Sequence, residues 1–482
     1  MKCYTFDYLY WKVTQPPLPR GAVLVEGENV LWTGPAGELP GDITPIHLGG
    51  VALPGLVDSH VHLIATGLDL LALSAGNFSN IPDLLEAINQ LDNSQEELVR
   101  VWGYDRDRFR ERRYPTLQEL DRACPKNLLW INHIESHGTL VNSNSLAAMG
   151  LLGERSLLTG EDNSRARQFF LSMVTPQERR DAIDAASQLA IRKGVTCLHA
   201  MEGGRLFHNA DLEAVLTTDL PLDLVVYPQV LDVDWASQRG FGQIGGCLPL
   251  DGSSGVYTAA VTQPYHGRND CGILYYNREE IRSFAWRAGE LDLQFALHAC
   301  GDRAIDLALD AIAWAREAGS SLPHRVEHFE LPRRNQADRA RELGAVLSMQ
   351  PAFDWFWGGP QGDYAYTLGP KRWQSANPLA WAVEAGAVVA GGSDSGVTPL
   401  DPLLGIHAAV YHKSPSQRVS LTEALKMFTE NGALAGRQRA GIIQPGYRAN
   451  ITVLAVDPFL EPCLKDIAVL ATIRGGQVVF RN

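Results

Sequence analysis

The chain has 482 residues, a net charge of −13, and hydrophobic and charged fractions of 45% and 20%. This composition permits a large buried core, argues against global disorder, and implies more than one domain or one large barrel with additions. The negative charge, with no basic run to offset it, disfavours a nucleic-acid partner, and no stretch of 18 apolar residues predicts a membrane span.

The seven cysteines are scattered, and no C-x-x-C pair occurs among them. Neither a disulfide framework nor a zinc finger is therefore expected. The first residues, Met1–Asp7, include an acid where a signal peptide would have its apolar segment. A reducing cytoplasm is the simplest compartment for such a chain.

Both ends of the chain show the alternating pattern of short antiparallel strands. Near the beginning these runs are Ala22–Val25 and Val30–Trp32, and near the end they are Ile451–Leu454 and Gln477–Phe480. Two strand-rich ends around a different middle predict one small sheet domain that is built from both termini. We place its boundaries at residues 1–50 and 440–482.

The middle of the chain, residues 51–439, alternates buried strand-like runs with amphipathic helices. The clearest helix covers about Arg303–Glu317, with Ile305 and Leu309 on one stripe and Gly319 as its stop. Eight strand–helix units imply parallel strands and right-handed crossovers, so we expect an α/β fold of the (β/α)₈ barrel type. The eight predicted strands are Leu53–Asp58, Val195–His199, Leu222–Tyr227, Gly245–Leu250, Gln294–His298, Arg325–His328, Ala345–Met349 and Val388–Gly392.

A long segment, residues 63–165, interrupts this rhythm between the first and second predicted strands. It contains its own strand-like and helical patterns, such as Leu128–Ile131. About a hundred residues are too many for a plain loop. We expect this segment to form a cap-like insertion over the mouth of the barrel.

Two histidines, His60 and His62, end the first predicted strand. Side chains two residues apart on a strand point to the same face, so both imidazoles can converge on one point. Nitrogen ligands placed in this way suit a first-row metal ion. Taken alone, the pair is equally compatible with two hydrogen-bonded polar residues at a strand end.

Three further metal-type side chains stand at the ends of other predicted strands. His298 ends the fifth strand, His328 ends the sixth, and Asp394 follows the eighth. The active site of a (β/α)₈ barrel lies at the carboxyl ends of its strands, so these groups would face one cavity. Five such residues on four strands favour a metal centre over a coincidence of satisfied polar groups.

The set of motifs in this chain resembles the amidohydrolase superfamily, and within it the YtcJ-like, amidohydrolase-3 branch. The matching segments are V-D-S-H-V-H at 57–62, W-G-Y-D at 102–105, L-V-N-S-N-S-L at 140–146, H-A-C-G-D-R-A at 298–304, H-R-V-E-H at 324–328, M-Q-P at 349–351, G-G-S-D at 391–394 and Q-P-G-Y-R-A-N at 444–450. The resemblance covers nearly the whole chain.

This resemblance implies a barrel together with a β-sandwich formed from both termini. It also implies that His60, His62, His298 and His328 bind one or two divalent ions, zinc or a similar metal. Asp394 would bind metal as well and orient the attacking water. Related enzymes are often homodimers, and their partners are small-molecule substrates rather than nucleic acids or membranes.

The fourth predicted strand departs from the family pattern. The family usually has a lysine there, often carboxylated, that bridges two metals, whereas alignment on Asp251, Gly252 and Ser253 places Cys247 at this position. One interpretation is a thiolate ligand, because a cation deprotonates a coordinating thiol. The other interpretation is that Cys247 packs as a small buried apolar residue, in which case the site would favour a single metal ion. Further on, Ser254–Val256 replaces the Gly-Ser-Arg of the family, so an arginine that would contact substrate has no counterpart there.

These residues predict metal-dependent hydrolysis of an amide-like carbon–nitrogen bond, other than a peptide bond, in a small molecule. A divalent ion lowers the pKa of water from about 15.7 to near 7 and polarises a carbonyl oxygen. Asp394 is placed to accept the proton of the water and to pass it to the leaving nitrogen. In a site with one metal, His328 could act from outside the coordination shell.

Three other polar residues are candidates for substrate contacts. His137 matches a family histidine in the insertion, although a hydrogen bond within its loop explains it as well. Tyr104 follows a strand-like run and could line the mouth, but a structural turn is the stronger interpretation. His199 ends the second predicted strand, where it is either a pocket residue or a buried hydrogen-bonded histidine.

Two alternative functions are weighed against this hypothesis. One is hydrolytic deamination of a heteroaromatic amine on a mononuclear site. Related deaminases place a glutamate three residues after the fifth-strand histidine, and here that position is Gly301. The other is a catalytically inactive barrel scaffold. Scaffolds of that kind usually lose metal ligands, whereas this chain keeps four histidines and the aspartate.

Overall fold

The computed structural model of the chain describes residues 1–41, 43–94, 97–151, 153–204 and 207–482. Strands and helices alternate along most of the chain, which confirms the α/β class. In the described part of the chain, no helix combines the length and the apolar character that crossing a bilayer requires.

All eight strands expected in the middle of the chain are present. They form two parallel sheets, with orders β15-β14-β8 and β16-β17-β18-β19-β20. The strands are β8 (Leu56–Val61), β14 (Val195–Glu202), β15 (Asp223–Pro228), β16 (Gln243–Pro249), β17 (Gln294–Gly301), β18 (Arg325–Leu331), β19 (Val346–Met349) and β20 (Val388–Gly391). Every pairing within these sheets is parallel, so the eight carboxyl ends share one side of the molecule.

Backbone hydrogen bonds join β8 to the segment that follows β20. The Asp394 amide donates to the His60 carbonyl at 2.8 Å, and the His62 amide donates to the Ser395 carbonyl at 2.9 Å. Val61 and Ser395 form an isolated parallel bridge at the same place. The first and the last of the eight strands are therefore neighbours, as a closed ring of strands requires.

Helices follow most of these strands and bury their apolar faces against them. The most apolar region lies between β16–β19 and their helices, where Ile305, Leu309 and Ile312 of one helix are fully buried. That helix is α10 (Asp302–Glu317), in agreement with the predicted stripe. The other helices of this part are α1 (Leu63–Leu71), α6 (Pro176–Arg192), α7 (Asn209–Thr217), α8 (Val233–Gln238), α9 (Arg278–Glu290), α11 (Arg334–Glu342), α12 (Pro351–Trp357), α13 (Asp363–Leu368), α14 (Leu379–Glu384), α15 (Pro402–Val410), α16 (Leu421–Met427) and α17 (Glu430–Ala435).

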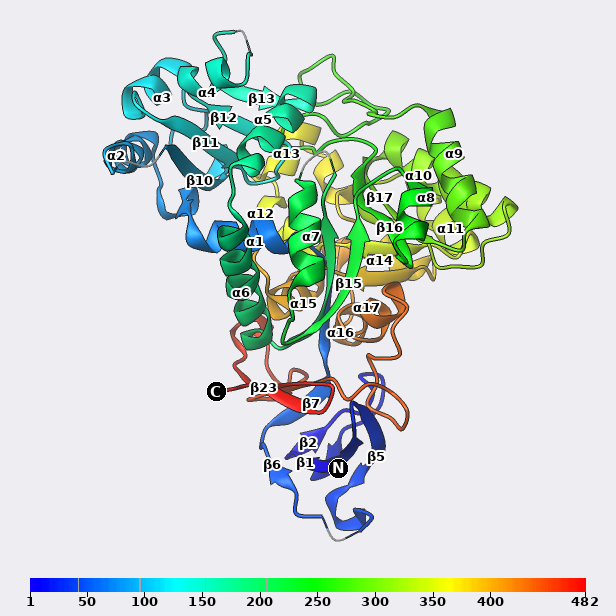
Figure 1. Cartoon of the computed structure of the whole chain (residues 1–482). Coiled ribbons are helices and arrows are strands. Elements are labelled where there is room, and N and C mark those ends of the chain that lie inside the picture. Colours follow the sequence, from blue (N-terminus) through cyan, green and yellow to red (C-terminus); the bar gives the residue numbers. More distant parts are fainter. Residues whose placement is uncertain (42, 95–96, 152, 205–206) are drawn as a thin grey trace.

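Both termini contribute to a separate pair of sheets at the narrow end of the molecule (Figure 1). One sheet contains β1 (Lys2–Thr5), β4 (Gly21–Glu26), β5 (Asn29–Pro35) and β6 (Ile46–His47). The other contains β2 (Tyr8–Leu9), β3 (Leu18–Pro19), β7 (Val51–Pro54), β21 (Ile451–Leu454), β22 (Val469–Arg474) and β23 (Gln477–Arg481). Side chains of both sheets, such as Tyr4, Val23 and Val453, share one apolar core.

The first of the eight strands begins later than its apolar pattern predicts. Leu53 and Pro54 belong to β7, which pairs with β21 in the terminal sheet. Gly55 separates β7 from β8, and a Cβ atom at this position would lie 2.3 Å from the Thr196 hydroxyl. The close approach of these backbones divides one apolar run between two sheets, a division that hydrophobicity alone does not reveal.

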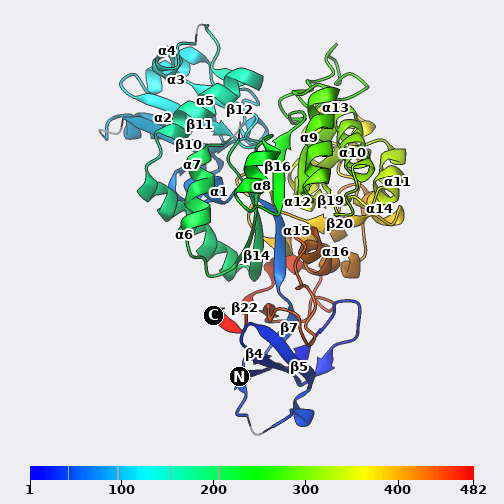
Figure 2. The same cartoon turned by 45° about the vertical axis from the view of Figure 1, so that its right-hand side comes forward.

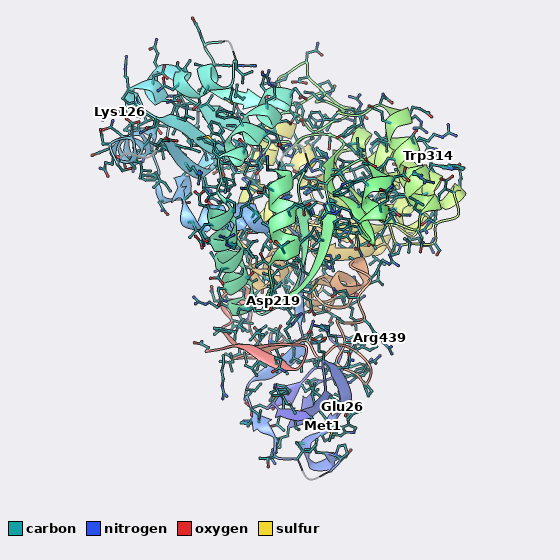
Figure 3. All side chains as sticks on the ribbon, in the orientation of Figure 1. Met1, Glu26, Lys126, Asp219, Trp314 and Arg439 are labelled. Carbon is teal, nitrogen blue, oxygen red and sulfur yellow. The ribbon has the colours of Figure 1, made fainter. Side chains whose placement is uncertain are left out.

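The long segment after β8 forms its own five-stranded sheet with helices on it. Its elements are β9 (Leu73–Ser74), α2 (Ile81–Asp92), β10 (Leu98–Tyr104), α3 (Leu117–Ala123), β11 (Leu128–His133), β12 (Gly138–Val141), α4 (Ser143–Ala148), β13 (Leu157–Thr159) and α5 (Gly160–Ser172). Figure 2 shows this sheet to one side of the strands, with α9 and α10 on the other side. Lys126 of this segment and Trp314 of α10 mark opposite sides of the wide part of the molecule (Figure 3).

Helix α1 lies within the predicted insertion but packs with the helices around the eight strands. Gly67 of α1 meets Ala182 of α6 so closely that a Cβ atom would lie 1.9 Å from the Ala182 carbonyl oxygen. The extra sheet therefore begins after α1, at β9.

Candidate metal centre

The two histidines of the first strand converge as their spacing predicts. His60 lies in β8 and His62 directly follows it, both are buried, and their ring centroids are 5.3 Å apart. His60 Nδ1 lies 2.6 Å from Glu327 Oε2, and His62 Nδ1 lies 2.9 Å from the Met201 carbonyl oxygen. Both acceptors place the proton on Nδ1, so the Nε2 lone pairs of the two rings remain available for a ligand.

Behind His60 lies a buried ionic layer made by alternate residues of β18. Arg325 donates from Nε to Glu327 Oε1 at 2.7 Å and from an Nη to Glu327 Oε2 at 2.9 Å. Burial would raise the pKa of Glu327, yet Arg325 and His60 outweigh it and hold the pKa below its usual value. An ionised Glu327 fixes the tautomer and orientation of His60 and makes it a better metal ligand.

A break in the strand alternation brings His328 to the same side as Glu327. Neighbouring residues of a regular strand point to opposite faces, but His328 has φ 71° and Phe329 has φ 49°. This left-handed turn of non-glycine residues costs free energy and is typical of functional sites. His328 Nδ1 lies 2.8 Å from Gln350 Oε1, and its ring centroid is 4.9 Å from that of His60.

Asp394 reaches the histidines from the segment after β20. Its Oδ1 lies 3.2 Å from His62 Nε2 and 3.5 Å from His60 Nε2. Its own φ is 52°, a second left-handed residue at this site. Burial would raise the pKa of Asp394, but the charge of His60 and the contacts with His62 and His328 hold it below its usual range.

Cys247 and His298 complete the predicted set on neighbouring strands β16 and β17. Cys247 Sγ lies 3.4 Å from His298 Nδ1 and 3.5 Å from His328 Nε2. His298 Nε2 donates to the Gly252 carbonyl at 3.2 Å, which leaves Nδ1 as the lone pair. Burial raises the pKa of the Cys247 thiol well above its usual value, so without a cation this sulfur is protonated.

The donor atoms of these residues fit a divalent metal ion. Among the described residues, neither His60 Nε2 nor Asp394 Oδ1 has a hydrogen-bond partner, although both atoms are buried. Buried polar atoms are normally satisfied, so this pair points to a missing ligand between them. The described part of the chain contains three groups of ligand atoms that lie within 4.8 Å of one another: His60, His62 and Asp394; His60, Cys247 and His328; and His298, Cys300 and His328.

A narrow cavity of about 30 Å³ opens over these ligands, with room for roughly two water molecules. The strands provide its floor, the insertion and the later loops provide its walls, and His137 is among its lining residues. The lining consists of His62, Glu135, Ser136, His137, Phe207, Cys247, Ser253, His298, Cys300, His328, Glu330, Phe353, Trp357, Asp394 and Val397.

Residues 48–480 match the Amidohydro_3 model, which describes the amidohydrolase family. The chain belongs to the amidohydrolase family. Among its relatives is the YtcJ protein of Bacillus subtilis, 26% identical over 90% of each chain. N-substituted formamide deformylase of Arthrobacter pascens is 25% identical over 96% of this chain and 95% of the relative. An uncharacterised metal-dependent hydrolase of Pyrococcus furiosus superposes with a TM-score of 0.74 at 25% identity, covering 95% of this chain and 99% of the other.

Two of the candidate substrate contacts of this amidohydrolase lie away from the cavity. Tyr104 is buried in the core of the insertion, where its hydroxyl donates to the Arg113 carbonyl at 2.7 Å and its ring stacks on Phe109. His199 lies beneath the ligands, where its Nδ1 accepts a hydrogen bond of 2.8 Å from Arg325. The structure therefore brings only His137 to the cavity, with its ring centroid 5.1 Å from that of His298.

Several residues of this amidohydrolase site were not among the sequence candidates. Cys300 Sγ lies 3.6 Å from His298 Nε2, and the spacing of two residues on β17 carries the same signal as His60 and His62. Glu327 lies inside the H-R-V-E-H motif, but the sequence prediction assigned it no function. Glu135 and Glu330 line the cavity from a loop and a strand end, and no local pattern distinguishes them from ordinary surface acids.

Proposed function

We propose that this amidohydrolase is a metal-dependent hydrolase of a carbon–nitrogen bond, other than a peptide bond, in a small molecule. The observation that carries the proposal is the convergence of His60, His62 and Asp394, two of whose buried polar atoms face each other without partners. The cavity above them combines apolar walls with a few polar groups, a lining typical of small-molecule sites. The formamide deformylase relative supports an amide-like bond.

The fold supports the same proposal. We propose that the eight parallel strands close into a (β/α)₈ barrel, and the hydrogen bonds between β8 and the segment after β20 support this closure. The barrel would lie within residues 51–439 and include α1, and its cap would be the part of residues 63–165 that begins at β9. Residues 1–50 and 440–482, together with β7, would form the β-sandwich. The ligands then lie where barrel enzymes place their chemistry, at the carboxyl ends of the strands.

The metal would be held first by His60, His62 and Asp394, and a second ion would use His298, His328 and Cys247. Nitrogen, sulfur and carboxylate donors together favour zinc. A bound divalent ion would supply an activated water and a polarised carbonyl oxygen. Gln350 accepts from the Nδ1–H of His328, which leaves a lone pair on Nε2, so a ligand role suits His328 better than a donor role.

Asp394 is the residue that would move the proton. Its depressed pKa keeps the carboxylate ionised at neutral pH, so it can accept the proton of an attacking water. Once protonated it is a strong acid, which favours transfer of the proton to the leaving nitrogen. Burial in the cavity excludes bulk water as a competing acceptor.

Metal removal and reconstitution test this function. The purified protein is stripped with a chelator, reloaded with Zn²⁺, Co²⁺ or Mn²⁺, and assayed for amine release from N-substituted formamides, acetamides and carbamoyl compounds. We expect hydrolysis to disappear with the metal and to return with it. The variant His62→Ala should lose metal, whereas His47→Ala, at an exposed position in β6, should not. Metal-loaded protein that cleaves none of these bonds would contradict the proposal.

The same assay distinguishes the deaminase alternative by measuring ammonia release from heteroaromatic amines. A glutamate in place of Gly301 has no room, because a Cβ atom there would lie 2.1 Å from the Ala260 carbonyl oxygen. We therefore expect no deamination.

A further inference from the structure

Two carboxyl groups line the cavity above the metal ligands, the buried Glu330 and the partly exposed Glu135. Glu135 comes from the turn after β11 of the insertion, and Glu330 comes from the end of β18. The Ser253 hydroxyl donates to Glu135 Oε2 at 2.7 Å, and the Ser254 hydroxyl donates to Glu330 Oε1 at 3.1 Å. Two consecutive serines therefore hold two carboxyl groups that arrive from different parts of the fold.

Neither carboxyl group forms an ion pair with a lysine or arginine of the described chain. The nearby Arg106 is bound to another acid, Asp363, at 2.9 Å. The largest charge effects on Glu135 come from Asp363, Glu330 and Asp105, all of them acids. A carboxylate shielded from water is costly without an opposite charge, so a cation in this cavity would stabilise both groups.

Short chains of contacts join both carboxyl groups to the metal ligand His298. His298 Nε2 contacts the Gly252 carbonyl, and the next residue is the serine that holds Glu135. On the other side His298 contacts Cys300 at 3.6 Å, and Cys300 is hydrogen-bonded to Glu330. A molecule that reaches from the ligands to these carboxyl groups therefore needs only a few bonds.

The polar and apolar lining of the same cavity also suits a bound molecule. Asp394 lines it, and among the described residues no group hydrogen-bonds its buried Oδ1. Apolar rings close the remaining walls, with Phe207 stacked on His62 at 4.2 Å and Phe353 lying 5.2 Å from Trp357. Apolar walls with a few convergent polar groups are typical of small-molecule sites.

We propose, on the basis of the function proposed above, that the substrate carries a cationic nitrogen group, an ammonium or amidinium, within a few bonds of the scissile carbon–nitrogen bond. Glu135 and Glu330 bind this group, and Asp394 with its histidines faces the bond that breaks. Burial and the charge of Asp363 raise the pKa of Glu135 well above its usual value. A bound cation would relieve the cost of ionising that group in the closed cavity.

Three matched substrates test this charge preference. N-(2-aminoethyl), N-propyl and N-carboxymethyl amides are compared, each with the acyl group that the reconstitution assay identifies. We expect kcat/KM for the aminoethyl compound to exceed that of the propyl compound by about tenfold to a hundredfold, as one or two charge-assisted hydrogen bonds would give. The carboxymethyl compound should be the poorest of the three.

The double variant Glu135→Gln/Glu330→Gln should bring kcat/KM for the aminoethyl and propyl compounds to within about twofold of each other. Glu279→Gln is the control, because its side chain is 76% exposed and its loss changes the net charge without touching the cavity. Equal rates for all three substrates in the native enzyme would overturn the charge preference and leave the hydrolase function standing.

If the metal-loaded protein hydrolyses no amide of any charge, the proposed function fails and binding decides the charge preference. Calorimetric titration then compares propylammonium with propionate. Binding of propylammonium alone, lost in the double variant but kept in Glu279→Gln, would support the cation site. Binding of propionate, or of neither ion, would overturn it.

Discussion

The floor and the roof of the cavity are built in different ways. The floor consists of the metal-type ligands at the strand ends, such as His60, His62 and Asp394, and of the buried residues behind them, such as Glu327. Buried ionic and backbone contacts hold these side chains in place. The roof consists of Glu135, His137 and the aromatic residues of α12, which come from the insertion and from a helix after β19. Parallel strands fix the floor, whereas the roof depends on how separate segments pack.

Charge distinguishes the two regions as well. The floor's buried acid, Glu327, lies between Arg325 and His60, so its charge is compensated within the protein. The roof's acid, Glu135, has other acids as its strongest charged neighbours, and among the described residues its side chain accepts a hydrogen bond from the Ser253 hydroxyl. The charge of the floor's acid is therefore balanced within the protein, and the floor needs only a metal. The charge of the roof's acid has no such balance, which a substrate would supply. The reaction would be set by the floor and the choice of molecule by the roof.

Asp394→Asn should have the largest effect, because it removes the proton acceptor and leaves the floor in place. We expect kcat to fall by about 10²–10⁴-fold, while the amide oxygen keeps most of the metal bound. Steady-state kinetics and metal analysis of the same preparation measure both quantities. Asp338→Asn, at an exposed position of α11, is the matched control and should retain full activity. Native rates in Asp394→Asn would show that another group moves the proton.

Glu327→Gln tests whether the stability and the metal affinity of the floor depend on the charge that Glu327 shares with Arg325 and His60. Arg325 would be left buried without a carboxylate, which costs about 3–5 kcal/mol of unfolding free energy, and His60 would lose its charged acceptor. We expect metal affinity to fall by about 10–100-fold. Denaturant unfolding and competitive metal titration measure the two effects.

The pair of Arg100 and Glu178 provides the comparison for this variant. The Glu178 side chain is 38% exposed, so Glu178→Gln should cost less than about 1 kcal/mol and leave metal affinity unchanged. If Glu327→Gln were as stable as Glu178→Gln, the ionic layer behind His60 would contribute little to the stability of the fold.

The floor is much easier to predict from the sequence than the roof, for physical reasons. Strand ends can be read from apolar runs, and parallel strands place their carboxyl ends together, so the sequence alone groups His60, His298 and Asp394. Glu135 and Glu330 carry no such signal, because their meeting depends on the fold of the insertion and on two serines in another loop.

The same limit explains why two candidate substrate contacts, Tyr104 and His199, lie away from the cavity. Tyr104 ends a strand, as expected, but that strand belongs to the sheet of the insertion and its ring is buried in a different core. His199 lies on β14, yet its hydrogen bond from Arg325 holds it below the floor. The left-handed residues His328 and Asp394 change which face a side chain reaches, and a strand pattern cannot show this change.

Cys247→Ala tests the ligand set of the floor, since it removes the sulfur that lies within 3.5 Å of both His298 Nδ1 and His328 Nε2. We expect the metal content to fall and the near-ultraviolet charge-transfer absorption of the cobalt-loaded protein to disappear, because that absorption requires a thiolate ligand. Cys463→Ala, far from the cavity in a loop near the C-terminus, should change neither. Unchanged metal content in Cys247→Ala would assign this cysteine to core packing and favour a single ion.

Asp223→Asn should have the smallest effect and tests a compensated charge at the opposite end of the strands. Asp223 begins β15 and accepts from Arg474 at 2.7 Å, from Asn450 at 2.8 Å and from Arg448. Burial would raise the pKa of Asp223, but these three partners outweigh it and lower the pKa below its usual value. Its stabilising contribution is therefore full above the unfolded pKa of about 3.9 and declines as pH falls through the lower folded value.

At neutral pH we expect Asp223→Asn to lose about 1–2 kcal/mol of unfolding free energy and to keep native metal content and activity. At a pH below the folded pKa of Asp223 the native and variant proteins should be about equally stable, which unfolding curves at several pH values would show. A constant difference across that range would mean that the asparagine loses packing rather than charge. Loss of activity at neutral pH would instead show that the terminal sheets and the floor are coupled through the strands.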